Sequence, residues 1–84
     1  MKVFLSTKAD RQLRKLPTPL YRILINRIES FIKEPFPSHA QKLAGRPGWR
    51  IRVGDYRILY VVDLKSKKTT ILSVAHRREA YKKV

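Results

Sequence analysis

The segment Arg50–Tyr60 constrains the fold more than any other stretch, because it predicts two strands joined by a tight turn. Gly54-Asp55 is a two-residue hairpin signal, since glycine readily takes the positive φ that such turns need. This turn predicts three cross-strand pairs: Val53 with Tyr56, Arg52 with Arg57, and Ile51 with Ile58. Paired residues share a face of the sheet, so one face is predicted to be apolar and the other to carry three arginines, Arg50, Arg52 and Arg57.

The arginine face of this hairpin brings like charges together, and like charges directly opposite each other repel. Such a face is most easily understood if an anion binds to it. The alternative is a solvated face whose arginines extend into water. The chain has 20 Lys and Arg against 6 Asp and Glu, a net charge of +14, whereas solubility asks for only about 2–8. The excess predicts a polyanionic partner, either RNA, DNA or an acidic protein segment.

The length of 84 residues predicts a single domain over 1–84 with a thin core, since a chain of this size buries only about 60% of its unfolded surface. There is no cysteine, so we expect neither a disulfide framework nor a thiolate metal site. His39 and His76 alone cannot make a structural zinc site. No apolar run reaches membrane length and no signal-peptide core is present, so we expect a soluble cytoplasmic protein.

Two helices are predicted before the hairpin. A short strand, Lys2–Leu5, leads to a first helix that Thr7 caps and Pro17 ends. Thr18 and the proline after it predict the start of a second helix. Its apolar stripe is predicted to be core and consists of Leu20, Ile23, Leu24, Ile28, Phe31 and Ile32.

The second half of the chain predicts strands only. Turns are expected up to Gly48, the hairpin follows, and Thr69–Ala75 is the last strand. The apolar centre of that strand predicts an interior position covered on both faces. The predicted order is β-α-α-β-β-β with a basic C-terminal tail. Because the helices come as a pair before the strands, we expect an α+β fold with an antiparallel sheet packed against an N-terminal α-hairpin.

Three segments, Lys42–Trp49, Arg50–Tyr60 and Ser73–Tyr81, together resemble the RelE/ParE superfamily of toxins from toxin–antitoxin modules. The hairpin marks the superfamily without separating its branches. The ending His-Arg-Arg-Glu-Ala-Tyr is similar to the RelE branch, whose members cut mRNA on the ribosome. The ParE branch poisons DNA gyrase and generally lacks that tyrosine arrangement.

The RelE-type resemblance implies a metal-independent, cofactor-free RNA endonuclease that inhibits translation. In such enzymes the ribose 2′-OH attacks the adjacent phosphate, leaving a 2′,3′-cyclic phosphate and a 5′-OH. The implied catalytic residues are Arg57, Arg77, Tyr81, Arg52 and His76. The candidate RNA-binding residues are Arg50, Lys42, Arg46, Arg78, Lys82 and Lys83. The expected partners are mRNA, the ribosome and an acidic antitoxin, with a monomer that becomes a hetero-oligomer on binding the antitoxin.

The sequence leaves the identity of the general base open. RelE-type sites carry lysines where this chain has Arg50 and Arg52, and arginine is a poor base because its pKa lies above about 12. Histidine is the residue type whose ordinary pKa lies near neutrality, so His76 is the natural substitute. Alternatively, His76 only closes the end of its strand through a backbone hydrogen bond. Two other functions also stay open: a gyrase inhibitor of the ParE type, and a non-catalytic module that binds RNA or the ribosome.

Overall fold

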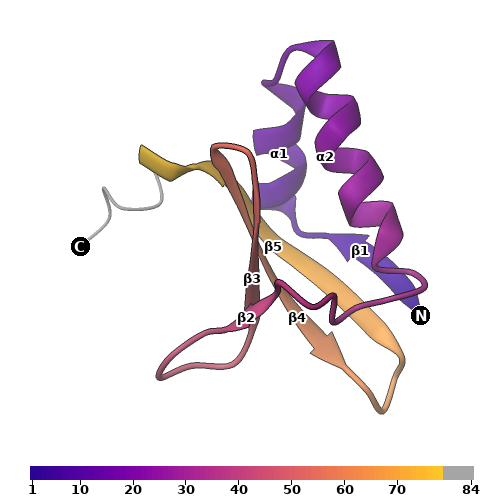
Figure 1. The fold of residues 1–84 in the computed structure, drawn as a ribbon. Helices are drawn as coiled ribbons and strands as arrows, with labels where there is room; N and C mark the ends of the chain where they lie inside the picture. Colours follow the sequence, from indigo (N-terminus) through magenta and orange to yellow (C-terminus); the bar gives the residue numbers. More distant parts are fainter. Residues whose placement is uncertain (79–84) are drawn as a thin grey trace.

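The computed structural model describes residues 1–78 and shows an α+β fold (Figure 1). In order, its elements are β1 (Lys2–Leu5), α1 (Thr7–Arg14), α2 (Thr18–Ser30), β2 (Gln41–Lys42), β3 (Trp49–Val53), β4 (Tyr56–Asp63) and β5 (Lys68–His76). The strands form one sheet in the order β1-β5-β4-β3-β2. The two helices lie next to each other on one side of it (Figure 1). The predicted fold class is confirmed; β2 is a short addition within the predicted loop. No helix in residues 1–78 is long and apolar enough to cross a membrane.

The predicted hairpin is confirmed pair by pair. In the β3–β4 ladder Val53 lies opposite Tyr56, Arg52 opposite Arg57, and Ile51 opposite Ile58. Gly54 has a φ of 60°, which glycine adopts without the steric cost of a Cβ atom. Ile51 and Ile58 are buried in the core, so the arginines lie on the opposite face.

The strand β1 departs from the antiparallel pattern of the other strands. It pairs in parallel with β5, with Val3 opposite Thr69 and Leu5 opposite Ile71. Parallel neighbours need a long connection, and here the helices and three strands separate β1 from β5 in sequence. This pairing gives β5 the interior position that its apolar centre predicted.

The prediction that both faces of β5 are covered is wrong at Leu72. Leu59 pairs with Ser73 and Tyr60 with Ile71, so Leu72 forms a bulge between them. A bulged residue has no partner in the ladder and its side chain is re-aimed. The Leu72 side chain is 37% exposed as a result.

The helix α1 is capped one residue earlier than the sequence predicts. Ser6 is the N-cap in place of Thr7, and its Oγ accepts a hydrogen bond from the Ala9 N–H at 3.0 Å. The same Oγ donates to the Leu72 carbonyl at 2.9 Å. This contact with β5 favours Ser6 over Thr7 as the N-cap residue. The helix α2 likewise begins at Thr18 itself, with Pro17 at the N-cap.

The core lies between the helices and one face of the sheet. Tyr60 is fully buried, and its ring stacks on Phe31 with 4.4 Å between the ring centroids. Its hydroxyl donates to the Pro35 carbonyl at 2.8 Å. Burial, together with the charge of Glu34, raises the pKa of Tyr60 to about 12. The hydroxyl therefore keeps the proton that this hydrogen bond needs.

The prediction that the whole apolar stripe of α2 is core is wrong for two of its residues. Leu24 and Ile28 are buried, whereas Ile23 is 54% exposed and Ile32 is 49% exposed. Successive residues of a helix differ by about 100° around its axis, which turns Ile23 away from the side that holds Leu24. Ile32 lies beyond the end of the helix at Ser30.

Candidate functional site

A groove of about 1070 Å³ lies along the sheet face that points away from the core. Its floor includes Arg57, Leu59, Ser73 and Ala75, which alternate along β4 and β5 with core residues. Lys8 and Gln12 of α1 form one wall together with Lys15 and Leu16, which directly follow the helix. The loop before β3 forms the other wall with Leu43, Arg46 and Pro47. Arg50, Tyr56, Leu72, Val74 and His76 complete the lining.

The groove concentrates positive charge. Among the described residues that line it, every Lys, Arg, Asp or Glu is basic: Lys8, Lys15, Arg46, Arg50 and Arg57. Cations held around one hollow repel each other, and the low-dielectric walls focus their field. Binding of an anion relieves this repulsion. This arrangement of cations fits the anion-binding interpretation of the arginine face, which stays a prediction.

Two arginines that line the groove, Arg57 and Arg50, are held differently. Arg57 is partly buried, between Arg52 on β3 and Ala75 on β5 in the ladder. Water screens a charge less at such a position than on an open surface. Arg50 is exposed, and its Nε and Nη2 donate to Gln41 Oε1 at 3.1 and 2.9 Å. Its guanidinium is thereby oriented beside β2.

Three more predicted residues lie beside the groove. Arg52 shares the face of Arg57 and is exposed, but it is not part of the lining. Arg77 and Arg78 follow β5 directly and are exposed. The Arg77 N–H donates to the Asp55 carbonyl at 2.7 Å, which joins the end of β5 to the hairpin turn.

Of the remaining predicted RNA contacts, Lys42 is described by the structure and does not line the groove. Lys42 pairs with Trp49, and its neighbour Gln41 with Arg50. Alternation along the strand places Lys42 on the face opposite Arg50. Tyr81, Lys82 and Lys83 lie outside the described residues.

The contacts of His76 bear on the open question of the general base. Its Nδ1 accepts a hydrogen bond from the Arg78 backbone N–H at 3.2 Å. In the neutral ring Nε2 then carries the proton and Nδ1 is the acceptor. A general base would have to take up a proton at Nδ1, which would break the hydrogen bond from Arg78. The ring packs edge-on against Tyr56, with 5.3 Å between centroids. These contacts favour the strand-closing role over that of a base.

We therefore expect His76→Asn to keep most of the activity of the protein. Asparagine can present Oδ1 where His76 presents Nδ1, and it does not titrate. Removal of a general base costs about a hundredfold or more in rate, so the predicted loss is well below that. The measurement is the rate of the RNA cleavage that the RelE-type resemblance implies, in a translation extract, with His39→Asn as a matched control on an exposed loop. A loss of a hundredfold with an unchanged melting temperature would restore His76 as the base.

Sequence reasoning missed the contribution of α1 to the site. Lys8, Gln12 and Lys15 line the groove, and their i, i+4, i+7 spacing places them on one stripe of the helix. That spacing was visible in the sequence. Which surface the stripe faces follows from the packing of α1 along β5, where Gln12 Oε1 accepts from the Val74 N–H at 2.6 Å.

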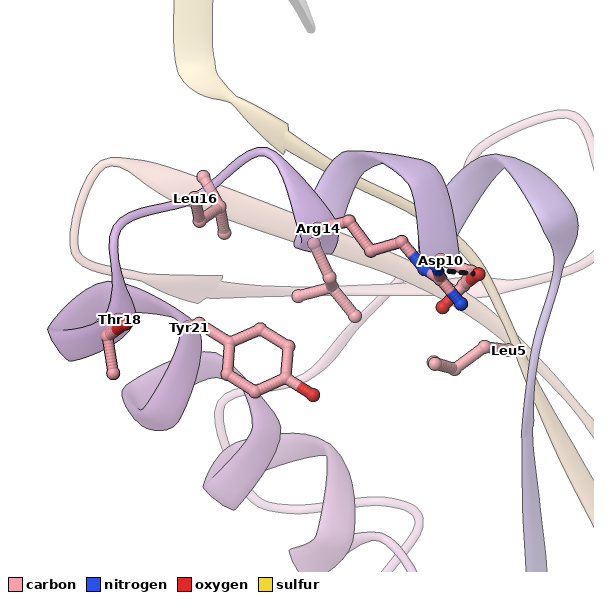
Figure 2. Close-up of a pocket in the computed structure, with 7 residues that line it drawn as sticks. Leu5, Asp10, Arg14, Leu16, Thr18 and Tyr21 are labelled. Atoms are coloured by element: carbon pink, nitrogen blue, oxygen red, sulfur yellow. Dashed lines mark ion pairs between the residues drawn. The ribbon is translucent and has the colours of Figure 1, made fainter.

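A second hollow, of about 380 Å³, lies between α1 and α2 (Figure 2). It is lined by Leu5, Asp10, Leu13, Arg14, Leu16, Thr18 and Tyr21. Arg14 Nε and Asp10 Oδ2 form an ion pair at 3.0 Å (Figure 2). Because the carboxylate already balances the guanidinium, this hollow is not a second anion site.

Comparison with known proteins gives a family and several structural matches. The model of a family described as the ParE toxin of type II toxin–antitoxin systems, parDE, matches residues 3–81. The chain is 29% identical to a chain of the RelBE2 toxin–antitoxin complex from Mycobacterium tuberculosis, with a TM-score of 0.80 over 90% of both chains. It is 28% identical to a chain of the archaeal RelE–RelB complex from Pyrococcus horikoshii, with a TM-score of 0.77 over 90% of this chain and 93% of that one.

A third match concerns the fold alone. The YoeB/ParE toxin from Agrobacterium tumefaciens is 14% identical and has a TM-score of 0.77 over 90% of this chain and 98% of that one. No curated protein matches the chain.

Proposed function

Because the chain belongs to the ParE toxin family of type II toxin–antitoxin systems, within the RelE/ParE superfamily, we propose that it is an endonuclease that cuts mRNA on the translating ribosome. The observation that carries this proposal is the groove, whose charged lining residues, among those described, are all basic. A phosphodiester backbone is a polyanion that such a lining fits.

The proposed reaction is a phosphate transesterification. The 2′-oxygen of a ribose bonds to the adjacent phosphorus while the bond from phosphorus to the 5′-oxygen breaks. The 2′-OH loses its proton and the leaving 5′-oxygen gains one. Negative charge grows on the non-bridging oxygens, where the guanidinium groups of Arg50 and Arg57 stabilise it.

The lining suits charge stabilisation better than proton abstraction. Arginine stays protonated, and Nδ1 of His76 already accepts a hydrogen bond from Arg78. Such a site depends on a substrate that arrives with its 2′-oxygen in line for attack, because positioning alone can supply a large part of a rate enhancement. We propose that the ribosome provides this alignment, which makes free RNA a poor substrate.

We also propose that an acidic antitoxin neutralises the toxin. The similar chains from Mycobacterium tuberculosis and Pyrococcus horikoshii were both solved in toxin–antitoxin complexes. With a net charge of +14, this chain attracts an acidic segment over a long range, so association is expected to be fast and salt-sensitive. Carboxylates placed near the groove would compete with RNA for the same cations.

One observation favours a different activity. The matching family model is that of the ParE toxins, which fits a protein that inhibits DNA gyrase without cutting RNA. Against this, the two structural matches reported above with 28% and 29% identity are to RelE–RelB and RelBE2 complexes.

The test is to induce the chain in growing bacteria and to follow labelled amino-acid and thymidine incorporation together with reporter mRNA integrity. We expect protein synthesis to stop first, with cuts in a reporter that is translated. The matched control is the same reporter with its start codon removed, which should stay intact. A DNA-damage response with intact mRNA would favour gyrase inhibition. Rapid cutting of both reporters would contradict dependence on the ribosome.

A further inference from the structure

The helix α1 presents three different faces. Ala9 and Leu13 are buried in the core. Asp10 pairs with Arg14 at 3.0 Å beside the hollow that faces α2. The third face carries Lys8 and Gln12, and the C-cap residue Lys15 continues it. All three line the groove.

The two lysines of the third face have uncompensated charges within the described part of the chain. In residues 1–78, neither Lys8 nor Lys15 takes part in an ion pair. The one carboxylate of the helix is engaged by Arg14. At i and i+7 the two lysines lie about 10.5 Å apart along the helix axis. They therefore form a row of positive charge along the groove.

The α1 wall is held firmly against the sheet. The Ser6 N–H donates to the Ile71 carbonyl at 2.9 Å, and the Ser6 Oγ donates to the Leu72 carbonyl at the same distance. After Ile71, β5 no longer pairs with β1. There the Val74 N–H donates a hydrogen bond to Gln12 Oε1 at 2.6 Å. The lysines are thus mounted on a rigid element, which lowers the entropic cost of using them to bind a ligand.

The opposite wall and the floor complement this row. Arg46 lies on the loop wall, next to Leu43 and Pro47. Leu59 and the bulged Leu72 give the floor apolar surface. Cationic walls over a partly apolar floor suit a single strand, whose phosphates meet the walls while a base rests on the floor.

We infer that α1 is a second phosphate-binding wall, in which Lys8 and Lys15 hold the RNA backbone beside the phosphate that Arg50 and Arg57 engage. This inference rests on the proposed function, of which it needs the binding of RNA in the groove and not its cleavage. It names the part of the chain that binds the flanking nucleotides. Lys8 and Lys15 bind RNA in this scheme and take no part in the bond changes. Gln12 accepts the Val74 N–H and thereby holds α1, and both lysines with it, against β5.

The test is the equilibrium binding of a 2′-O-methyl RNA oligonucleotide, which lacks the attacking hydroxyl, over a range of salt concentrations. The variant is Lys8→Gln with Lys15→Gln. We expect the slope of log affinity against log salt to fall by about 1.4, or about 0.7 for each lost phosphate contact to a single strand. We also expect binding at least about tenfold weaker at low salt. The variant Lys8→Arg with Lys15→Arg keeps both charges and should show the same slope as the unchanged protein.

The matched control is Lys33→Gln with Lys65→Gln, which removes the same charge from two exposed positions outside the groove. This pair should leave the slope unchanged. A further variant, Gln12→Glu, keeps an acceptor for the Val74 N–H and adds a carboxylate to the groove. We expect it to weaken RNA binding without lowering the melting temperature.

The outcomes separate the two proposals. Equal changes of slope in the wall variant and the control variant would overturn the inference, since net charge alone would explain them. An unchanged slope in the wall variant would overturn it as well, even if mRNA cleavage is established. If the chain cuts no mRNA but the slope falls as expected, the nuclease proposal fails and the α1 wall stands.

Discussion

Replacing Arg57 by alanine is expected to lower mRNA cleavage by about a hundredfold or more, equivalent to about 3 kcal/mol of transition-state stabilisation. Arg57 is partly buried in the groove floor and lies opposite Arg52. Arg57 lines the groove in which charge would develop during the proposed transesterification, and solvent screens it less than an exposed arginine. The measurement is the cleavage rate in a translation extract together with growth inhibition in cells.

Two further variants test whether the loss of cleavage is specific to the Arg57 guanidinium. Arg57→Lys keeps the charge but loses the planar fork that can bind two phosphate oxygens, so we expect an intermediate rate. Arg22→Ala removes the same charge from an exposed position on α2 outside the groove and should keep full activity. Full toxicity of a folded Arg57→Ala protein would remove Arg57 from the catalytic set.

Replacing Gly48 by alanine is expected to destabilise the fold by about 2–5 kcal/mol, from backbone strain and overpacking together. Gly48 has a φ of 124°, and a Cβ there would lie 3.1 Å from Leu43 Cδ1 and 3.2 Å from the Tyr60 carbonyl oxygen. The Leu43 N–H donates to the Gly48 carbonyl at 3.0 Å. The change therefore disturbs the loop wall of the groove as well as the core. Thermal unfolding should show a melting temperature lower by at least about 10 °C.

The matched control for this prediction is Gly45→Ala. Gly45 also has a positive φ, of 73°, but nothing lies within 4 Å of a Cβ added there. It tests backbone strain without the clash, and we expect it to cost only about 1–2 kcal/mol. If both variants melt at the same temperature, close packing around Gly48 is not what requires glycine at that position.

The hairpin was predictable from the sequence because its determinants are local. The turn at Gly54-Asp55 sets the register, and strict alternation then assigns Ile51 and Arg52 to opposite faces. The same holds for the helical periodicity that places Leu24 and Ile28 in the core. Such features depend on residues within a few positions of each other, so neighbouring side chains are enough to specify them.

The groove was predictable only on its sheet side. Arg50 and Arg57 belong to the hairpin, and their shared face follows from its register. Lys8 and Lys15 reach the same hollow because α1 lies along β5. That placement depends on the parallel pairing of β1 with β5, between residues 66 positions apart. No local signal specifies such a pairing, since many strand partners bury similar apolar area.

Tertiary contacts also decided the finer assignments. Ser6 caps α1 in place of Thr7 because its hydroxyl also reaches the Leu72 carbonyl, 66 residues away. Leu72 is exposed because β4 and β5 differ by one residue across the bulge, which alternation within β5 alone does not reveal. The sequence by itself determined the two helices, the hairpin register and the surplus of positive charge. The tertiary structure decided which cations share one groove, because that depends on free energies of packing between segments far apart in the chain.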